Sequence, residues 1–341
     1  MILLRRGCGA GAVVLLCLGL LGCDEPPLEF GGPTMGSSYS VKYLPGARGP
    51  TVVQAQAATE AILAEVDQQL STYRDDSLIA RFNALPAHSC QPLPAEVLAL
   101  VAFGEQLSQQ SGGAFDMTLE PLLNLWGFGP QARGERVPTA SEIAAARLQV
   151  GHQHVHIDGR QLCKDAAVAL DFNSIAAGYA VDRIATKLGE LGVGSYLVEV
   201  TGEVKAMGQK ADGSPWRIAI EAPLDNQQVA QRILPLDGYG ISTSGDYHNY
   251  FEQDGQRYSH TLDPLTGAPI SHGLAQVSVV DRSVQRADGL STLLMVLGPE
   301  RGLAFAEREG IAALFVSRVG QGFVSHSSSA FTQLFGLAEQ P

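Results

Sequence analysis

Two short stretches combine carboxylates, hydroxyls and small residues in a way that suits a phosphate and a metal ion. In the first, LDFNSIAAGYAVD, Asp171 is followed by Asn173 and Ser174 and then by small residues that lead into a predicted helix. Exposed N–H groups at a helix start bind phosphate, and small side chains let it approach. In the second, ADGLST, Asp288 and Thr292 are four residues apart and share one helix face, which offers the oxygen ligands that Mg2+ prefers. Each stretch alone is equally typical of an ordinary helix cap.

A third stretch adds a histidine. The segment 240–246, GISTSGD, is followed by YSHTLDPLTG, in which Asp263-Pro264 starts a turn that Gly267 closes. His260 stands just ahead of this turn, and a histidine is suited to act as a base or a ligand near neutral pH. The alternative is a His260 that only hydrogen-bonds the turn.

Three further histidines alternate along the chain, at His152, His154 and His156. On a strand, alternate residues share a face, so three imidazoles there suggest a transition-metal site. However, such neighbours are about 6.6 Å apart at Cα, and no adjacent acid or cysteine completes a ligand set. We interpret this segment as a solvent-facing strand.

The elements that position these residues are a mixture of helices and antiparallel hairpins. Helical periodicity and capping signals predict helices over 51–70, 94–110, 174–191, 290–296 and 300–309, and a short helix that starts at the capping box of Thr139 and Glu142. Strand-like runs occupy 196–204, 217–221, 240–244, 276–280 and 312–317, and Asp158-Gly159 and Asp254-Gly255 read as hairpin turns. Because no regular βαβ alternation appears, the sequence predicts an α+β fold.

The N-terminus indicates export. Arg5 and Arg6 precede an apolar run that is too short to span a bilayer, and LLGC resembles the bacterial lipobox. We therefore expect residues 1–22 to be a signal peptide, Cys23 to be lipidated, 23–33 to be a tether, and 34–338 to be the folded domain. Asp24 resembles an inner-membrane retention signal, so we expect an anchor on the periplasmic side of the bacterial inner membrane. The alternative is an ordinary signal peptide with an incidental cysteine.

Charge and cysteine content limit the partners. The chain has 23 basic and 35 acidic residues, and loss of Arg5 and Arg6 leaves the mature protein near −14. Nucleic acid is therefore excluded as a partner, because it requires a basic surface, and a polyphosphate ligand would need a metal or local dipoles. Cys90 and Cys163 remain after export, and the sequence leaves open whether they pair.

Taken in order, these stretches resemble the ApbE family of FAD:protein FMN transferases over nearly the whole mature chain. The resemblance rests on GPTMG at 32–36, LSTY at 70–73, GAFD at 113–116, LWGFG at 125–129, the Asp171 stretch, HxxDPxTG at 260–267 and ADG at 287–289. It implies two related T-fold-like lobes with FAD between them. It also implies Mg2+-dependent transfer of the FMN moiety of FAD to a Thr or Ser hydroxyl of an acceptor protein, with release of AMP.

The resemblance also implies residue roles. FAD would be held by eight positions, which are Met35, Tyr73, Ala114, Phe115, Asp116, Asp171, Ala177 and Ile270. Ser174, Asp288 and Thr292 would hold the metal, and His260 and Asp288 would be catalytic. The acceptors would be exported domains of membrane electron-transfer proteins. We expect Trp126 and Phe128 to pack in the core rather than on the flavin.

Three positions depart from the family pattern. Ala177 stands where many relatives carry Lys or Glu, so a charged contact is absent there. Ser174 stands where many relatives have Gly. Ser291 stands where some relatives have Asp, and this second replacement leaves one metal contact to water.

Two alternative functions stay open: an FAD diphosphatase that releases FMN and AMP, and a non-catalytic flavin-binding lipoprotein.

Overall fold

An eight-stranded antiparallel sheet forms the centre of the molecule. The computed structural model describes residues 26–132, 134–224, 229–247 and 249–336, so the predicted signal peptide and Cys23 lie outside the described residues. The strands are ordered β1-β2-β6-β7-β10-β15-β16-β17. Their bounds are β1 Leu28–Thr34, β2 Ser37–Leu44, β6 Ser195–Val200, β7 Glu203–Met207, β10 Tyr239–Gly245, β15 Leu274–Asp281, β16 Ala312–Val319 and β17 Gly322–Ser327.

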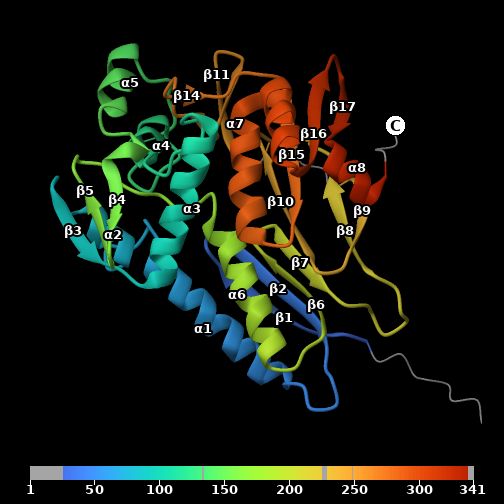
Figure 1. Cartoon of the computed structure of the whole chain (residues 1–341). Helices are drawn as coiled ribbons and strands as arrows, with labels where there is room; N and C mark the ends of the chain where they lie inside the picture. Colours follow the sequence, from blue (N-terminus) through green and yellow to red (C-terminus); the bar gives the residue numbers. More distant parts are fainter. Residues whose placement is uncertain (1–25, 133, 225–228, 248, 337–341) are drawn as a thin grey trace, which may run out of the picture.

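The sheet consists of two halves with the same order of elements. In each half, two strands precede a long helix and two strands follow it: α6 (Ala176–Glu190) lies between β2 and β6 in sequence, and α7 (Val284–Glu309) lies between β15 and β16. The two helices pack side by side on one face of the sheet (Figure 1). The α+β prediction is confirmed, and the repeated order agrees with two related lobes.

The long segment between β2 and α6 adds a second, mainly helical region beside α6 and α7 (Figure 1). Its elements are α1 Val52–Leu70, α2 Leu78–Asn83, β3 Ser89–Pro92, α3 Ala95–Ser111, α4 Glu120–Trp126, α5 Ala140–Arg147, β4 Val155–Asp158 and β5 Gln161–Lys164. The main apolar core lies between these helices and the sheet. None of the described helices is both long and apolar enough to cross a membrane.

Short elements complete the fold on the far side of the sheet and beside α4. These are β8 Trp216–Glu221, β9 Ala230–Leu236, β11 Tyr250–Gln253, β12 Gln256–Ser259, β13 Leu262–Asp263, β14 Ala268–Pro269 and α8 Ser329–Phe335. A second core forms where β8, β9 and α8 cover the sheet, around Trp216, Leu234 and Phe331. A third, smaller core surrounds Trp126 and Leu262.

Local capping explains several boundaries that the sequence predicts correctly. Thr51 caps α1 in a capping box with Gln54, and Thr139 caps α5 in the same way with Glu142. The α3 helix ends at Gly112, whose φ of 65° is the left-handed conformation that glycine favours. The hairpin turn at 254–255 is also confirmed, whereas Asp158 is the last residue of β4 and the turn there lies one residue later, at 159–160.

Three predictions about elements are wrong. From Leu28 onward, the expected tether is strand β1, which pairs with β2 along its whole length. The predicted strand 196–204 is two strands, β6 and β7, because Thr201 and Gly202 form a turn with φ values of 54° and 109°. The predicted helices 290–296 and 300–309 are the two parts of α7, which starts earlier, at Val284, and is kinked at Gly298.

The two cysteines of the described chain, Cys90 and Cys163, are paired. Cys90 in β3 and Cys163 in β5 face each other across the two strands and form a disulfide. The bond joins segments 73 residues apart in the sequence, so it closes a long loop of the helical region.

Candidate functional site

Asp288 lies where α6 and α7 touch. The residue is 6% exposed, and its Oδ2 accepts a hydrogen bond from the backbone N–H of Gly178 at 2.9 Å. A side chain at Gly178 would place its Cβ 2.4 Å from the carbonyl oxygen of Val284, so only glycine permits this approach. The structure therefore brings together the Asp171 stretch and the Asp288 stretch, which the sequence separates by more than a hundred residues.

Hydroxyl groups from β10 and α7 surround Asp288. The Oγ of Ser244 lies 2.8 Å from Ser291 Oγ and 3.4 Å from Thr292 Oγ1, so Thr292 and Asp288 belong to one cluster. Ser242 Oγ lies 3.2 Å from Ser291 Oγ, and Ser291 Oγ donates to the backbone carbonyl oxygen of Asp288 at 2.9 Å. The donors here are all oxygens, which is the set that suits Mg2+.

A second carboxylate, Glu203 on β7, faces the same cluster. Its Oε2 accepts from Thr201 Oγ1 at 2.8 Å. Burial raises the pKa of Glu203 to about 7. Burial, together with the nearby charge of Glu203, raises the pKa of Asp288 well above its usual range. Two acids held this close in a low dielectric favour a bound cation, so the residues fit a divalent metal.

The cluster differs from a typical transition-metal centre. Among the residues that the structure describes, no group of three or more His, Cys, Asp or Glu is placed to hold a metal. His152 and His154 lie in a short 3-10 turn, and only His156 is in β4, so the predicted strand of three histidines is wrong. His152 pairs with Glu105 at 2.9 Å and His154 with Asp165 at 2.7 Å.

Asp171 lies buried just before α6. Its backbone N–H donates to the carbonyl of Met117 at 2.7 Å, which joins the segment after Asp116 to the start of α6. Its carboxylate accepts from the backbone and the side chain of Asn173 at 2.7 and 3.0 Å. Burial raises the pKa of Asp171 from 3.8 to about 6. Ser174 lies in the turn that follows and is half-buried.

We expect Asp171→Asn to stabilise the ligand-free protein at neutral pH and to weaken FAD binding. The folded protein holds the Asp171 proton to a higher pH than the unfolded chain does. The contribution of Asp171 to the free energy of unfolding is therefore complete below about pH 4 and is lost as the pH rises through about 6. The free energy of unfolding should therefore rise by about 1–3 kcal/mol at pH 7.5 and stay unchanged at pH 4. Denaturant unfolding at both pH values measures this. FAD titration should show affinity lowered about 10-fold or more, and an unchanged affinity would contradict the assigned role.

The remaining predicted FAD positions differ in exposure. Ala114, Phe115 and Asp116 are buried, and the Asp116 carboxylate accepts from Thr118 and from the backbone N–H of His152. Tyr73 is 67% exposed, and the charges of Asp171 and Glu120 act on its hydroxyl. Ala177 is buried at the start of α6. Met35, in the β1–β2 turn, and Ile270 are linked to this region by packing against the main core.

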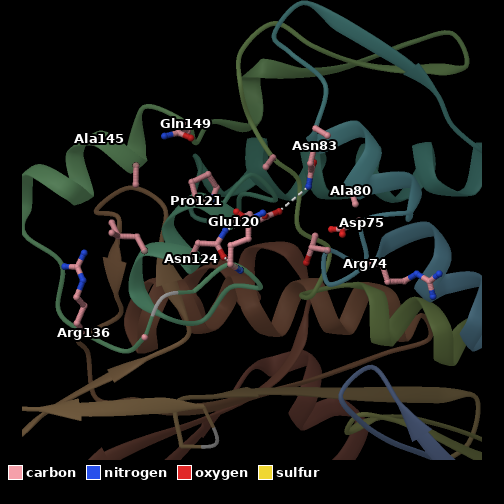
Figure 2. A pocket seen from close by; sticks show the side chains of 17 residues that line it. Arg74, Asp75, Ala80, Asn83, Glu120, Pro121, Asn124, Arg136, Ala145 and Gln149 are labelled. Carbon is pink, nitrogen blue, oxygen red and sulfur yellow. Dashed lines mark hydrogen bonds between the residues drawn. The ribbon is translucent and has the colours of Figure 1, made fainter.

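A cavity of about 710 Å3 lies next to Tyr73, because its lining includes Thr72 and Arg74. Ala169, two residues before Asp171, also lines it, but none of the eight predicted FAD positions is among its lining residues. This volume is within the range of ligand pockets in proteins. Glu120 projects into its centre, where it accepts hydrogen bonds from Asn83 at 3.2 Å and Asn124 at 3.5 Å (Figure 2). Burial, and then the charge of Asp171, raise the pKa of Glu120.

Glu120 and Asn83 line this cavity, and the sequence reasoning missed both. Asn83 donates to the carbonyl of Leu170 and accepts from its backbone N–H, both at 2.8 Å, and so fixes the residue before Asp171. A glutamate in the first turn of a helix reads only as a favourable charge at its positive end. The sequence therefore carries no signal that would have singled out Glu120.

The geometry of His260 fixes its tautomer. Its Nδ1 lies 3.0 Å from the carbonyl oxygen of Asn249, which can only accept, so Nδ1 carries the hydrogen. In the neutral ring the lone pair is then on Nε2, the atom suited to act as a base. The ring of Phe128 meets His260 edge-on at 6.4 Å. Trp126 is buried and donates to the carbonyl of Gly267 at 2.8 Å, so the prediction that it packs in the core is confirmed.

Comparison with known proteins identifies the family. Residues 35–315 match the sequence profile of the ApbE family. The chain is 43% identical to an FAD:protein FMN transferase of Vibrio cholerae over 92% of this chain and 94% of the relative, and 35% identical to an FAD:protein FMN transferase of Escherichia coli over 94% and 95%.

Solved structures of ApbE flavin transferases have the same fold as this chain. The crystal structure of the Pseudomonas stutzeri flavinyl transferase ApbE in its apo form superposes with a TM-score of 0.86 at 65% identity and covers 91% of this chain and 97% of that one. The flavin transferase ApbE of Vibrio cholerae superposes with a TM-score of 0.85 at 41% identity, over 91% and 100%. Sequence and fold together show that this chain belongs to the ApbE family.

Proposed function

We propose that this protein transfers the FMN moiety of FAD to a Thr or Ser hydroxyl of an acceptor protein and releases AMP, with Mg2+ bound by Asp288, Thr292 and Ser174. The observation that carries the proposal is the buried cluster of oxygen ligands at the contact of α6 and α7. The relatives named FAD:protein FMN transferase support the same activity.

The reaction exchanges one phosphorus–oxygen bond for another. The acceptor hydroxyl oxygen attacks the FMN-side phosphorus of FAD, the bond to the AMP phosphate breaks, and AMP leaves. When bound, Mg2+ neutralises the diphosphate charge and stabilises the leaving oxygen. Asp288 and Thr292 would hold the metal ion in position, and the start of α6 presents small residues to the phosphates. His260 Nε2 accepts the proton of the acceptor hydroxyl.

Flavinylation of an acceptor tests the activity. The purified full-length protein in detergent is mixed with FAD, Mg2+ and an exported domain of a membrane electron-transfer protein. We expect a fluorescent protein band that survives denaturing electrophoresis, together with an equal amount of AMP. Free FMN and AMP without a labelled band would instead indicate an FAD diphosphatase, and FAD binding without AMP release would indicate a non-catalytic carrier.

We also propose that the protein is anchored by a lipid on the periplasmic side of the inner membrane, beside its acceptors. The support is the lipobox that ends at Cys23 and the Asp24 that follows it. Cys23→Ser should give an uncleaved or released protein without lipid, as measured by the mass of the N-terminal peptide and by membrane fractionation. A wild-type protein that is soluble in the periplasm and carries no lipid would rule out the anchor.

A further inference from the structure

Strand β7 directs Glu203 toward the helices. Alternate residues of a strand point to opposite faces, and Val204 and Ala206 belong to the second core on the far side of the sheet. Glu203 and Lys205 therefore face α6 and α7. The register that pairs Ile241 with Val204 places Ser242 of β10 opposite Glu203 as the next pair.

The hydrogen-bond donors that hold the two carboxylates are neutral groups. Ser242 is buried and lies beside both acids: the register of β10 places it opposite Glu203, and its Oγ is 3.2 Å from the Oγ of Ser291. The Ser291 hydroxyl donates to the carbonyl oxygen of Asp288 at 2.9 Å instead of to a carboxylate. Thr201 donates to the Glu203 carboxylate and the Gly178 N–H donates to the Asp288 carboxylate, so a hydroxyl and a backbone amide hold the two acids and neither donor carries a charge.

No cationic side chain completes this arrangement within the described part of the chain. Lys205, on the same face of β7, donates to Asp182 and to the carbonyl of Arg282, both at 2.7 Å. These contacts hold its ammonium group at the start of α7, where Asp182 also binds Ser283. Asp288 is buried and Glu203 is partly buried, and two such like charges without a counterion are costly, so a cation from solution is the remaining way to compensate them.

We propose that Glu203 is a second anionic residue of the metal site and acts with Asp288 on the same divalent cation, directly or through a bound water. This inference rests on the proposed function, which places the cation at Asp288. The site then takes one acid from each half of the sheet: β7 belongs to the first half, and α7 to the second. Two carboxylates balance the charge of a divalent ion, so the site holds the ion even before FAD brings its diphosphate.

Metal binding without FAD tests this inference. Mn2+ is titrated into the full-length protein in detergent at pH 7.5, and free Mn2+ is measured by electron paramagnetic resonance. We expect Glu203→Gln to weaken Mn2+ binding at least about 10-fold, since the amide keeps the shape but lacks the charge. Glu203→Asp keeps the charge on a shorter side chain and should lose less of the Mn2+ affinity than Glu203→Gln does.

Glu199→Gln is the matched control, because Glu199 lies on the neighbouring strand β6 and its carboxylate accepts a hydrogen bond from Ser40. It removes the same charge close by and should change the Mn2+ affinity less than about 2-fold. If Glu203→Gln binds Mn2+ as the wild type does while Asp288→Asn does not, the role of Glu203 is refuted and the metal site stands. If both variants bind like the wild type, the metal part of the proposed function fails as well.

Discussion

Asp288→Ala is expected to lower FMN transfer at least about 10³-fold, which is the largest loss we expect from a single substitution. Asp288 is the buried carboxylate at the α6–α7 contact, where it accepts a hydrogen bond from the backbone N–H of Gly178. Its removal takes away the charge that fixes the metal beside the diphosphate. Thr292→Ala should reduce transfer less, by about 10-fold, because a neutral oxygen contributes less than an anion.

Transfer to an acceptor protein over a range of Mg2+ concentrations measures both effects. Burial raises the pKa of Asp288, so the alanine variant should unfold no more easily than the wild type in the absence of metal. A melting temperature close to that of the wild type therefore separates lost chemistry from lost folding. Near-normal transfer by Asp288→Ala at low Mg2+ would show that the metal site is misassigned.

Elements that are defined by local capping could be predicted from the sequence. Thr51 with Gln54 and Thr139 with Glu142 satisfy backbone groups through residues three positions apart, so the signal lies within one helical turn. The Asp254-Gly255 turn is equally local, since residues with positive φ are needed exclusively at the turn itself.

The start of α7 could not be predicted because Gly289 is required by packing against residues that are remote in the sequence. In the sequence, Gly289 stands directly before the predicted helix 290–296. In the structure it is inside α7, where a Cβ would lie 2.9 Å from Leu107 and 3.0 Å from both Ile175 and Phe103. The true cap is Ser283, whose side chain accepts from the N–H of Arg286. Asp288 is therefore held by a continuous helix and not by a flexible helix start.

Strand β1 was missed because its composition is that of a linker. Pro33 and two glycines suit a tether, but β1 is at the edge of the sheet and pairs on one side with β2. An edge strand tolerates proline because only half of its backbone groups need strand partners. Gly31 lies against the backbone of Tyr39, a contact that depends on the pairing of two strands.

The residues that complete the site depend on long-range contacts. The family resemblance supplied Asp288 and Thr292, and the structure places them in one hydroxyl cluster. Glu203 is separated from Asp288 by 85 residues and reaches it through the register of β7 with β10. Glu120 is similarly remote from Asp171 in sequence and lies near it through the contact of Asn83 with Leu170. A single sequence contains no pattern for such pairs.

His260→Ala is expected to lower transfer about 10²-fold while FAD still binds. The hydroxyl that attacks phosphorus must lose its proton, and the bond from Nδ1 to the carbonyl of Asn249 leaves the lone pair on Nε2 to accept it. The loss is smaller than for Asp288 because, in a loose phosphoryl-transfer transition state, positioning and metal charge supply most of the stabilisation. Transfer rate, FAD affinity and melting temperature are measured on the same preparation.

His260→Asn separates a base from a residue that only holds the turn. The asparagine amide can donate to the Asn249 carbonyl as Nδ1 does, but it cannot accept a proton at neutral pH. A base therefore predicts that the asparagine variant melts like the wild type and loses transfer as the alanine variant does. A purely structural histidine predicts that asparagine restores stability, FAD binding and transfer together. His156→Ala, an exposed histidine on β4, should leave all three unchanged. Normal FAD binding and normal transfer by His260→Asn would exclude the base.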